Sequence, residues 1–192
     1  MGAHSNYGKG RDRLVAAAAE LFYAQGVTAS GVDMVVASAG VSKPTLYAHF
    51  RSKDELIAAA LEWQHRQRRS QVEAVFAASS SDPVQQVLEH FDWLAQWHES
   101  NGCRGCAFLN AAPELVGPQH EKARLIVQQH KRWWRGRFEH LLAEAGLAEP
   151  ERVADEVLLL FEGASARVAV EQTTEPVRTA RRMAEDLLAR LG

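Results

Sequence analysis

The fold is decided by residues 41 to 56, which read VSKPTLYAHFRSKDEL. Ser42 is suited to begin a short helix, because its hydroxyl can accept a hydrogen bond from an N–H group of the first turn. Pro44 then lies in that first turn, where a missing N–H costs little. Ser52 and Glu55 fit the capping box that begins a further helix. These positions predict a short helix, a tight corner and the start of a longer helix.

A second short helix is predicted immediately upstream of this stretch. Ser30 and Asp33 fit another capping box, and Gly40 suits the left-handed residue that ends a helix. Two short helices joined by a glycine-containing turn form a helix-turn-helix. The second helix carries polar side chains that can meet phosphates or base edges, namely Lys43, Thr45, Tyr47 and His49. The pattern therefore predicts double-stranded operator DNA as a partner.

The residues expected to contact DNA lie on this second helix and at the starts of the helices around it. Helix N-termini present free N–H groups to phosphates. Phosphate contacts are expected from Ser30, Ser42, Tyr47, His49 and Lys53. Base-edge contacts are expected from Lys43 and Thr45. Pro44 belongs to the same predicted DNA-binding set, although it removes one N–H that could otherwise meet a phosphate.

Residues 10 to 60 resemble the DNA-binding part of the TetR family of transcriptional regulators. The resemblance rests chiefly on the ordered pattern AGVSKxTLYxHFxSKxEL, which ends at Leu56. Val36 stands where the family often has alanine, and Pro44 where glycine is common. The resemblance implies a homodimeric, ligand-responsive DNA-binding protein, usually a repressor. It also implies a regulatory domain that diverges widely within the family.

Charge is unevenly distributed along the 192 residues. The net charge is −2, but residues 1–70 carry nine Lys and Arg against six Asp and Glu, whereas the remainder carries thirteen against eighteen. A basic N-terminal part and an acidic remainder favour an orientation toward DNA. The sequence contains no run of 18 apolar residues and its first residues form no apolar signal segment. We therefore expect a cytoplasmic protein that does not enter a membrane.

The apolar periodicity and the capping residues predict an all-α fold of about nine helices. A three-helix helix-turn-helix head is expected over residues 1–51, and a helical ligand-binding and dimerisation bundle over residues 52–192. The helices are expected at about residues 9–25, 30–40, 42–50, 52–78, 82–99, 106–116, 118–145, 149–172 and 175–190. Pro113 should kink or break the helix that contains it.

Two apolar stripes on the last two helices predict the dimer interface. Their members are Val157, Phe161 and Ala164 on one helix and Ala184, Leu187 and Leu188 on the other. Two such helices from each of two subunits would form a four-helix bundle. The alternative is that both stripes pack inside the monomer. The family resemblance and the symmetry of palindromic operators favour the dimer.

Aromatic residues in the middle of the chain indicate where an effector would bind, because ligand pockets are mostly apolar with a few polar groups. The predicted lining consists of Phe91, Trp97, Phe108, Asn110, Gln129 and Trp133. A small apolar or aromatic effector bound there is expected to depopulate the DNA-binding state of a repressor. The alternative is that these aromatic side chains belong to the core.

Cys103 and Cys106 form a CxxC motif that carries the alternative hypothesis, a thiol-based redox-sensing regulator or a CxxC redox protein. A structural zinc site needs two further ligands at suitable spacing, and the chain has neither a second CxxC nor an HxxxH, so no metal is expected. A protein-interaction module that has lost DNA binding is a further alternative. No Ser/His/Asp or paired-carboxylate arrangement stands out, so we expect no catalytic residue, no cofactor and no enzymatic activity.

Overall fold

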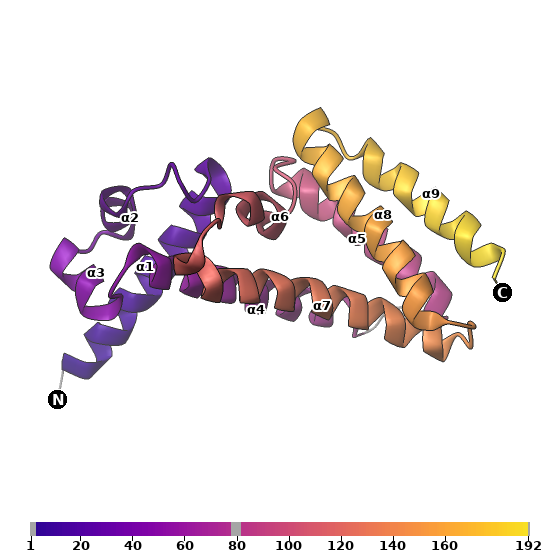
Figure 1. Cartoon of the computed structure of the whole chain (residues 1–192), viewed down its shortest axis with the longest axis horizontal. Coiled ribbons are helices and arrows are strands. Elements are labelled where there is room, and N and C mark those ends of the chain that lie inside the picture. The colour runs from indigo at the N-terminus through magenta and orange to yellow at the C-terminus, as the bar shows by residue number, and fades with distance from the viewer. Residues whose placement is uncertain (1–2, 78–81, 192) are drawn as a thin grey trace. The chain divides into compact units, whose positions relative to one another are not determined.

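The computed structural model describes residues 3–77 and 82–191, and within these ranges the chain is helical without strands (Figure 1). The α-helices are α1 (Ala3–Gln25), α2 (Val32–Ala39), α3 (Lys43–His49), α4 (Lys53–Phe76), α5 (Pro83–Ser100), α6 (Ala107–Ala111), α7 (Glu121–Glu144), α8 (Pro150–Glu171) and α9 (Glu175–Ala189). The all-α prediction is confirmed. Two 3-10 turns, Ala112–Glu114 and Pro118–His120, stand where longer helices were expected. The predicted end of the fourth helix at residue 78 lies outside the described residues.

The described chain folds into two compact units, neither of which is continuous in sequence. The first unit comprises residues 1–71 and 108–128, and the second comprises residues 72–107 and 129–192. Helices α4 and α7 each contribute residues to both units. The sequence predicted one domain boundary, after residue 51. Each compact unit is instead built from two separate segments of the chain.

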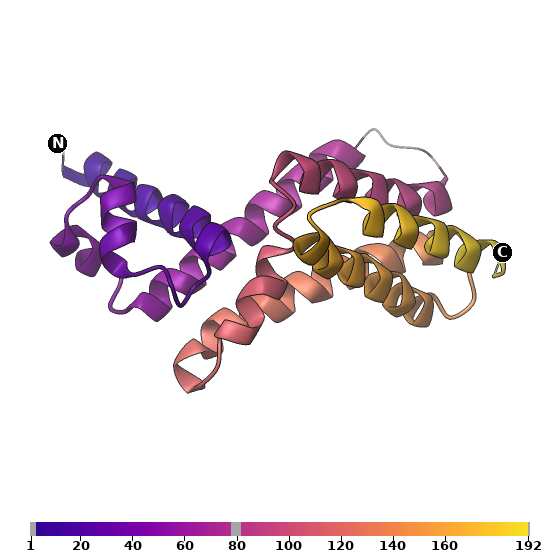
Figure 2. The same ribbon diagram turned by 90° about the horizontal axis from the view of Figure 1, so that it is seen from above.

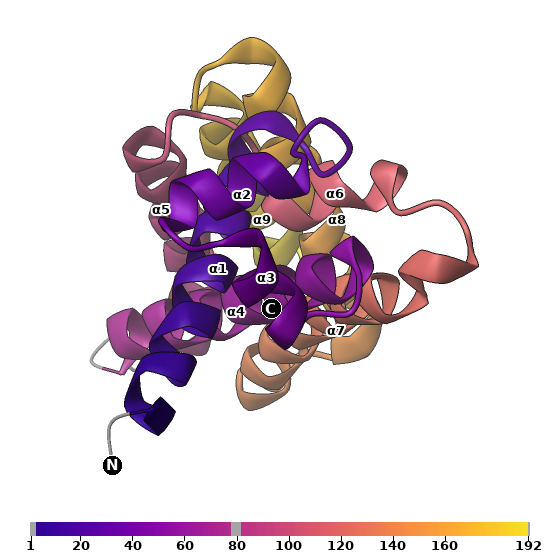
Figure 3. The ribbon, with the colours of Figure 1, turned by 90° about the vertical axis from the view of Figure 1, so that its left-hand side faces the viewer.

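The first unit places α2 and α3 on α1 through a buried apolar core, formed by Leu14, Ala18, Val35, Leu46 and Leu56. Gly40 ends α2 in the left-handed conformation, as predicted, with a φ of 60°. Its carbonyl accepts a hydrogen bond from Arg13 Nη2 at 3.0 Å. Ser42 caps α3 by accepting a hydrogen bond from the Thr45 N–H. These caps fix the corner between the two short helices (Figure 3).

The predicted capping box at Ser30 is wrong. Gly31 is the N-terminal cap of α2, and it makes no side-chain capping bond. Ser30 is fully buried, and its hydroxyl donates instead to the carbonyl of Gly26 at 2.7 Å. The reason is that the carbonyl groups at the end of α1 also need donors, and Ser30 lies within reach of them.

The second unit is a helical bundle in which α9 lies along α8 and α5 (Figure 2). Its core is rich in aromatic side chains. Phe161 of α8 contacts Phe91 of α5 and Phe138 of α7, with ring centroids 5.4 and 5.5 Å apart. Trp134 packs 4.7 Å from the same Phe161 ring. Across the described residues, the length and hydropathy of the helices do not suffice for a membrane span.

Candidate nucleic-acid interface

Four of the eight predicted DNA-contacting residues are exposed on α3 and its N-terminal cap. Ser42, Lys43 and Pro44 are exposed, and Tyr47 is 52% exposed. Thr45 is partly exposed, and its hydroxyl lies 2.8 Å from that of Ser42. On the opposite side of the helix, Leu46 is completely buried, which fixes the rotation of α3 about its axis.

His49 is turned partly toward α1. A Cβ built on Gly10 of α1 would lie 3.6 Å from His49 Nε2 and 3.5 Å from the Thr45 methyl group. The His49 side chain is partly buried and its ring is tilted against Phe50. A methyl group at position 10 would therefore make only ordinary van der Waals contacts with these two side chains.

Lys43 is held by a carboxylate of the neighbouring helix. Its Nζ lies 2.8 Å from Asp33 Oδ1, in the first turn of α2. Both side chains are exposed, at 52% for Lys43 and 81% for Asp33. The hydrogen bond to Asp33, and then the charge of that carboxylate, raise the pKa of Lys43 above its usual value. Sequence reasoning assigned Asp33 to a capping box and missed this contact.

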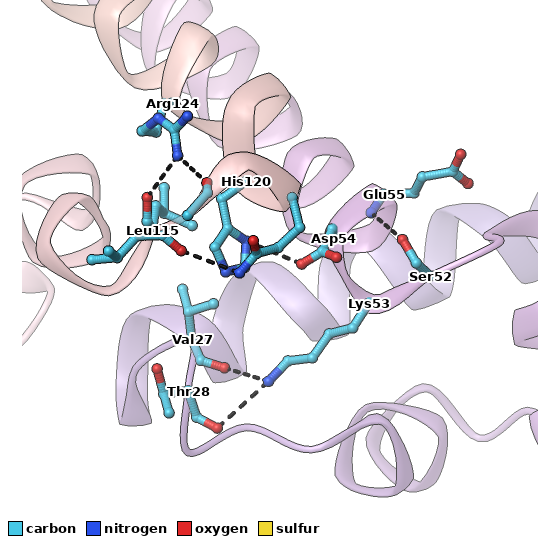
Figure 4. A network of polar contacts seen from close by, with 12 residues as sticks. Val27, Thr28, Ser52, Lys53, Asp54, Glu55, Leu115, His120 and Arg124 are labelled. Atoms are coloured by element: carbon cyan, nitrogen blue, oxygen red, sulfur yellow. Dashed lines mark hydrogen bonds and ion pairs between the residues drawn. The ribbon is translucent and has the colours of Figure 1, made fainter.

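The side chains of Lys53 and Ser30 donate hydrogen bonds to backbone carbonyl groups around the turn between α1 and α2 instead of pointing into solvent. Lys53 Nζ donates to the carbonyl oxygens of Val27 at 2.7 Å and Thr28 at 3.5 Å (Figure 4). Ser30 is buried, as described above, so its hydroxyl is not available to a phosphate. Both residues therefore lie in the predicted region but stabilise its backbone in the DNA-free chain.

The same turn is held from its N–H side by Glu114, which follows α6 in sequence. The carboxylate accepts hydrogen bonds from the backbone N–H of Val27 at 3.1 Å and of Thr28 at 2.6 Å. Gly26, with a φ of 91°, lies directly against it, since a Cβ there would be 2.9 Å from Glu114 Oε1. Desolvation raises the pKa of Glu114, but the hydrogen bonds from Thr28 and Val27 and the charge of Lys53 outweigh it and lower the pKa overall.

One further contact attaches the segment after Glu114 to α4, and another closes this segment on itself. His120 Nδ1 lies 3.0 Å from Asp54 Oδ1 in the first turn of α4 (Figure 4). Arg124 Nη1 donates to the carbonyl of Leu115 at 3.1 Å and to that of Gly117. We call Glu114, His120 and Arg124 the polar clasp. These residues lie 60 or more positions from Val27 and Asp54, and no local sequence signal predicted the contacts.

The residues predicted to line a ligand pocket are divided between the two units. Phe91 is completely buried, while Trp97 and Trp133 are partly buried, all within the second unit. Gln129 is exposed in that unit. Phe108 is buried and Asn110 is exposed in the first unit. Phe91 and Trp133 belong to or pack against the aromatic core, as the alternative interpretation expected.

A buried polar group that sequence reasoning overlooked lies beside this core. His90 is completely buried and stacks on Phe76, with ring centroids 3.8 Å apart. Its Nδ1 lies 2.6 Å from the Gln86 carbonyl oxygen, and Arg137 Nε lies 2.5 Å from its Nε2. Burial lowers the pKa of His90 to about 3. The imidazole is therefore neutral, with Nδ1–H donating to Gln86 and Nε2 accepting from Arg137.

The two cysteines are free thiols, both partly buried. Lys131 Nζ lies 3.7 Å from Cys106 Sγ and 2.9 Å from Glu162 Oε1, so its charge is shared with a carboxylate. Among the described residues, no group of three or more His, Cys, Asp or Glu side chains is arranged to hold a metal ion.

The apolar stripes predicted for the dimer interface face the interior of one chain. Five of their members are buried within the second unit, namely Val157, Phe161, Ala164, Ala184 and Leu188, while Leu187 is partly exposed. A different set of small and apolar residues lies on the exposed side of α8. We call Leu159, Gly163, Ala166 and Val170 the outer stripe; Leu159 is 72% and Val170 83% exposed.

The chain resembles known bacterial regulators over both units. Residues 14–60 match the bacterial regulatory proteins of the tetR family. Residues 83–183 match the C-terminal domain of LmrA/YxaF-like transcriptional regulators. A TetR-family transcriptional regulator from Streptomyces coelicolor, known from its crystal structure, is 32% identical, with 96% of each chain covered and a TM-score of 0.84.

Two further relatives are similar at 25% identity. One is the HTH-type transcriptional regulator YjdC of Escherichia coli strain K12, for which 93% of each chain is covered. The other is the HTH-type transcriptional repressor DhaR of Mycobacterium sp. strain GP1, for which 87% of this chain and 86% of that protein are covered.

Proposed function

Because the chain belongs to the TetR family of bacterial transcriptional regulators, we propose that it acts as a homodimeric repressor of a pseudo-palindromic operator and is released by a small apolar effector. Family membership makes it a DNA-binding transcriptional regulator and not an enzyme. The observation that carries the proposal is the exposed side of α3, where Lys43, Pro44 and Tyr47 face solvent while Leu46 is completely buried.

Within this proposal, Lys43 and Thr45 read base edges, and Ser42, Tyr47 and His49 hold phosphates. Pro44 lies between these groups in the first turn of α3. Lys53 and Ser30 take a supporting part, because their polar atoms stabilise the turn between α1 and α2. Repression is favoured by the similarity to DhaR, which is named a repressor.

The proposed dimer uses the outer stripe of α8. Its four residues are spaced at i, i+4, i+7 and i+11, so they lie on one side of the helix. Gly163 and Ala166 in the middle are small enough to let a second helix approach closely, while Leu159 and Val170 offer apolar contact at either end. A chain that exposed this stripe as a monomer would leave two large apolar side chains in water.

The effector is proposed to bind among the partly buried aromatic residues of the second unit, Trp97 and Trp133. Release of DNA would then depend on α4 and α7, which contribute to both units. The polar clasp supports such coupling, because it fastens the segment leading into α7 to the first turn of α4 and to the turn between α1 and α2.

The proposal is tested by selecting duplexes from a random-sequence library with the purified full chain. We expect a pseudo-palindromic consensus, bound by a dimer in light scattering. Thr45→Ala should mainly relax the choice among sites, whereas Tyr47→Phe should weaken binding to all of them. A transcription assay with the selected operator upstream of a reporter distinguishes repression from activation. Failure to enrich any sequence above the starting library would reject the proposal.

A further inference from the structure

We propose that Glu114 is a positioning residue for DNA binding, which holds the turn between α1 and α2 in place and links that turn to the second unit. A change in the second unit then lowers DNA affinity by breaking the hydrogen bonds of this carboxylate. The inference rests on the proposed function, because it assumes that α3 reads operator DNA. Glu114 touches no DNA itself and acts through the turn at Val27 and Thr28.

The turn is the part of the first unit on which the placement of α2 depends. Val27 is buried, and α2 begins four positions after Thr28. Glu114 accepts from both N–H groups of this turn, one with each carboxylate oxygen, at 3.1 and 2.6 Å. Lys53 donates to the two carbonyl oxygens of the same residues (Figure 4). The backbone of the turn is therefore held from its N–H side and from its carbonyl side by different helices or segments.

Glu114 belongs to a segment that is joined to the second unit at both ends. Residues 108–128 are part of the first unit, but the chain passes into the second unit both before Phe108 and after Gln128. Lys53, in contrast, belongs to the continuous stretch 1–71. A rearrangement of the second unit therefore acts on this segment from two ends, and the bonds of Glu114 carry its effect to the turn.

The strength of these bonds sets the size of the effect. The net contribution of one hydrogen bond corresponds to roughly a two- to tenfold change in an equilibrium. Without the carboxylate the turn samples other placements, and the apparent affinity for DNA falls in proportion to the competent fraction. The charge acts in the opposite direction, because removing a carboxylate favours the approach of phosphates. A fall in affinity would therefore identify placement as the cause.

The test measures affinity at pH 7 by fluorescence anisotropy, with the duplex selected by the wild-type chain as the probe. Glu114→Gln should bind roughly two- to tenfold more weakly, because an amide N–H group replaces one accepting oxygen. Glu121→Gln removes an equal charge from an exposed position of the same segment and should bind at least as tightly as wild type. Gln64→Ala removes a bond from α4 to the Ala19 carbonyl, so it controls for lost stability and should bind as wild type does.

Hydrogen exchange gives a second readout, which a purely structural role would not change. If the bonds of Glu114 favour DNA binding, operator binding must favour these bonds in turn. The selected duplex should therefore slow backbone exchange in residues 112–120 of the wild-type chain, although these residues meet no DNA. It should also alter exchange in residues 129–144, the part of α7 that belongs to the second unit. Glu114→Gln should reduce both changes.

Three results would overturn the inference. They are unchanged operator affinity in Glu114→Gln, an equal loss of affinity in Gln64→Ala, and operator binding that leaves exchange in residues 112–120 of wild type unchanged. If Glu114→Gln does not fold, the exchange of the wild-type chain decides alone. If wild type binds no duplex at all, the proposed function fails first, whereas a binding wild type with an unaffected Glu114→Gln rejects only the inference.

Discussion

The buried imidazole of His90 should make the stability of the chain fall in mild acid. In the folded chain its pKa is lowered to about 3, whereas the unfolded chain protonates near the ordinary value of 6.5. Between these values the unfolded state binds more protons, so the free energy of unfolding decreases as pH falls. The contribution is fully present above about pH 6.5 and is lost progressively toward pH 3.

Each pH unit in this window corresponds to about 1.4 kcal/mol for one group, so the loss due to His90 is about 2 kcal/mol at pH 5. The physical cause is chiefly burial, because protonation would place a charge in a site from which water is excluded, and the neighbouring charge of Arg137 acts in the same direction. Burial also lowers the pKa of His65, which should add to the loss in the same direction.

Denaturant unfolding followed by tryptophan fluorescence at pH 7.5 and pH 5 measures the effect. His90→Gln keeps an amide that can donate and accept but does not titrate, so its stability should fall by about 2 kcal/mol less than that of wild type between the two pH values. His140→Gln changes an exposed histidine of the same unit and should behave as wild type does. Equal pH dependence in wild type and His90→Gln would refute the reasoning.

Three further predictions concern the dimer, the clasp and the thiols. Leu159→Glu should dissociate the proposed dimer in light scattering while circular dichroism shows a folded chain, and Val116→Glu, equally exposed outside the outer stripe, should leave it intact; a dimeric Leu159→Glu would place the interface elsewhere. Glu114→Gln should lower stability at pH 7 by about 1 kcal/mol, with the difference shrinking as pH falls below the ordinary carboxyl pKa of 4.5 and disappearing only below the lowered pKa of the folded chain, whereas Glu121→Gln should show no such loss. Replacing Cys103 and Cys106 by serine should leave operator binding and effector release unchanged in a gel-shift assay; loss of release would favour a thiol switch.

Local signals were sufficient for the helix-turn-helix. The cap of Ser42, the left-handed Gly40 and the hydroxyl of Ser52, which accepts from the Glu55 N–H, depend on residues at most five positions apart. Ser30 shows the limit of such signals. Its hydroxyl lies between the end of α1 and the start of α2. It donates to the carbonyl of Gly26, at the end of α1, and does not cap α2.

Contacts between segments that lie far apart in the sequence could not be predicted from such local signals. From the sequence alone, Glu114 cannot be distinguished from a solvent-exposed carboxylate. Its partners, the N–H groups of Val27 and Thr28, lie far away in the sequence and meet it only in the folded chain. The same holds for α8, whose two sides both carry apolar residues. Periodicity predicted the stripe that contains Val157 but missed the outer stripe, and only the structure shows that Val157 faces inward and Leu159 outward.

The discontinuity of the first unit limits how this regulator can be recombined. A fragment ending at residue 71 would lack Glu114 and His120, and would leave the N–H groups of Val27 and Thr28 without their carboxylate. A chimera that joins this DNA-reading part to the sensory part of another regulator would therefore need residues 108–128 to travel with residues 1–71. A productive exchange therefore takes three crossover points, after residues 71, 107 and 128, whereas a single splice in α4 would separate segments that contact each other.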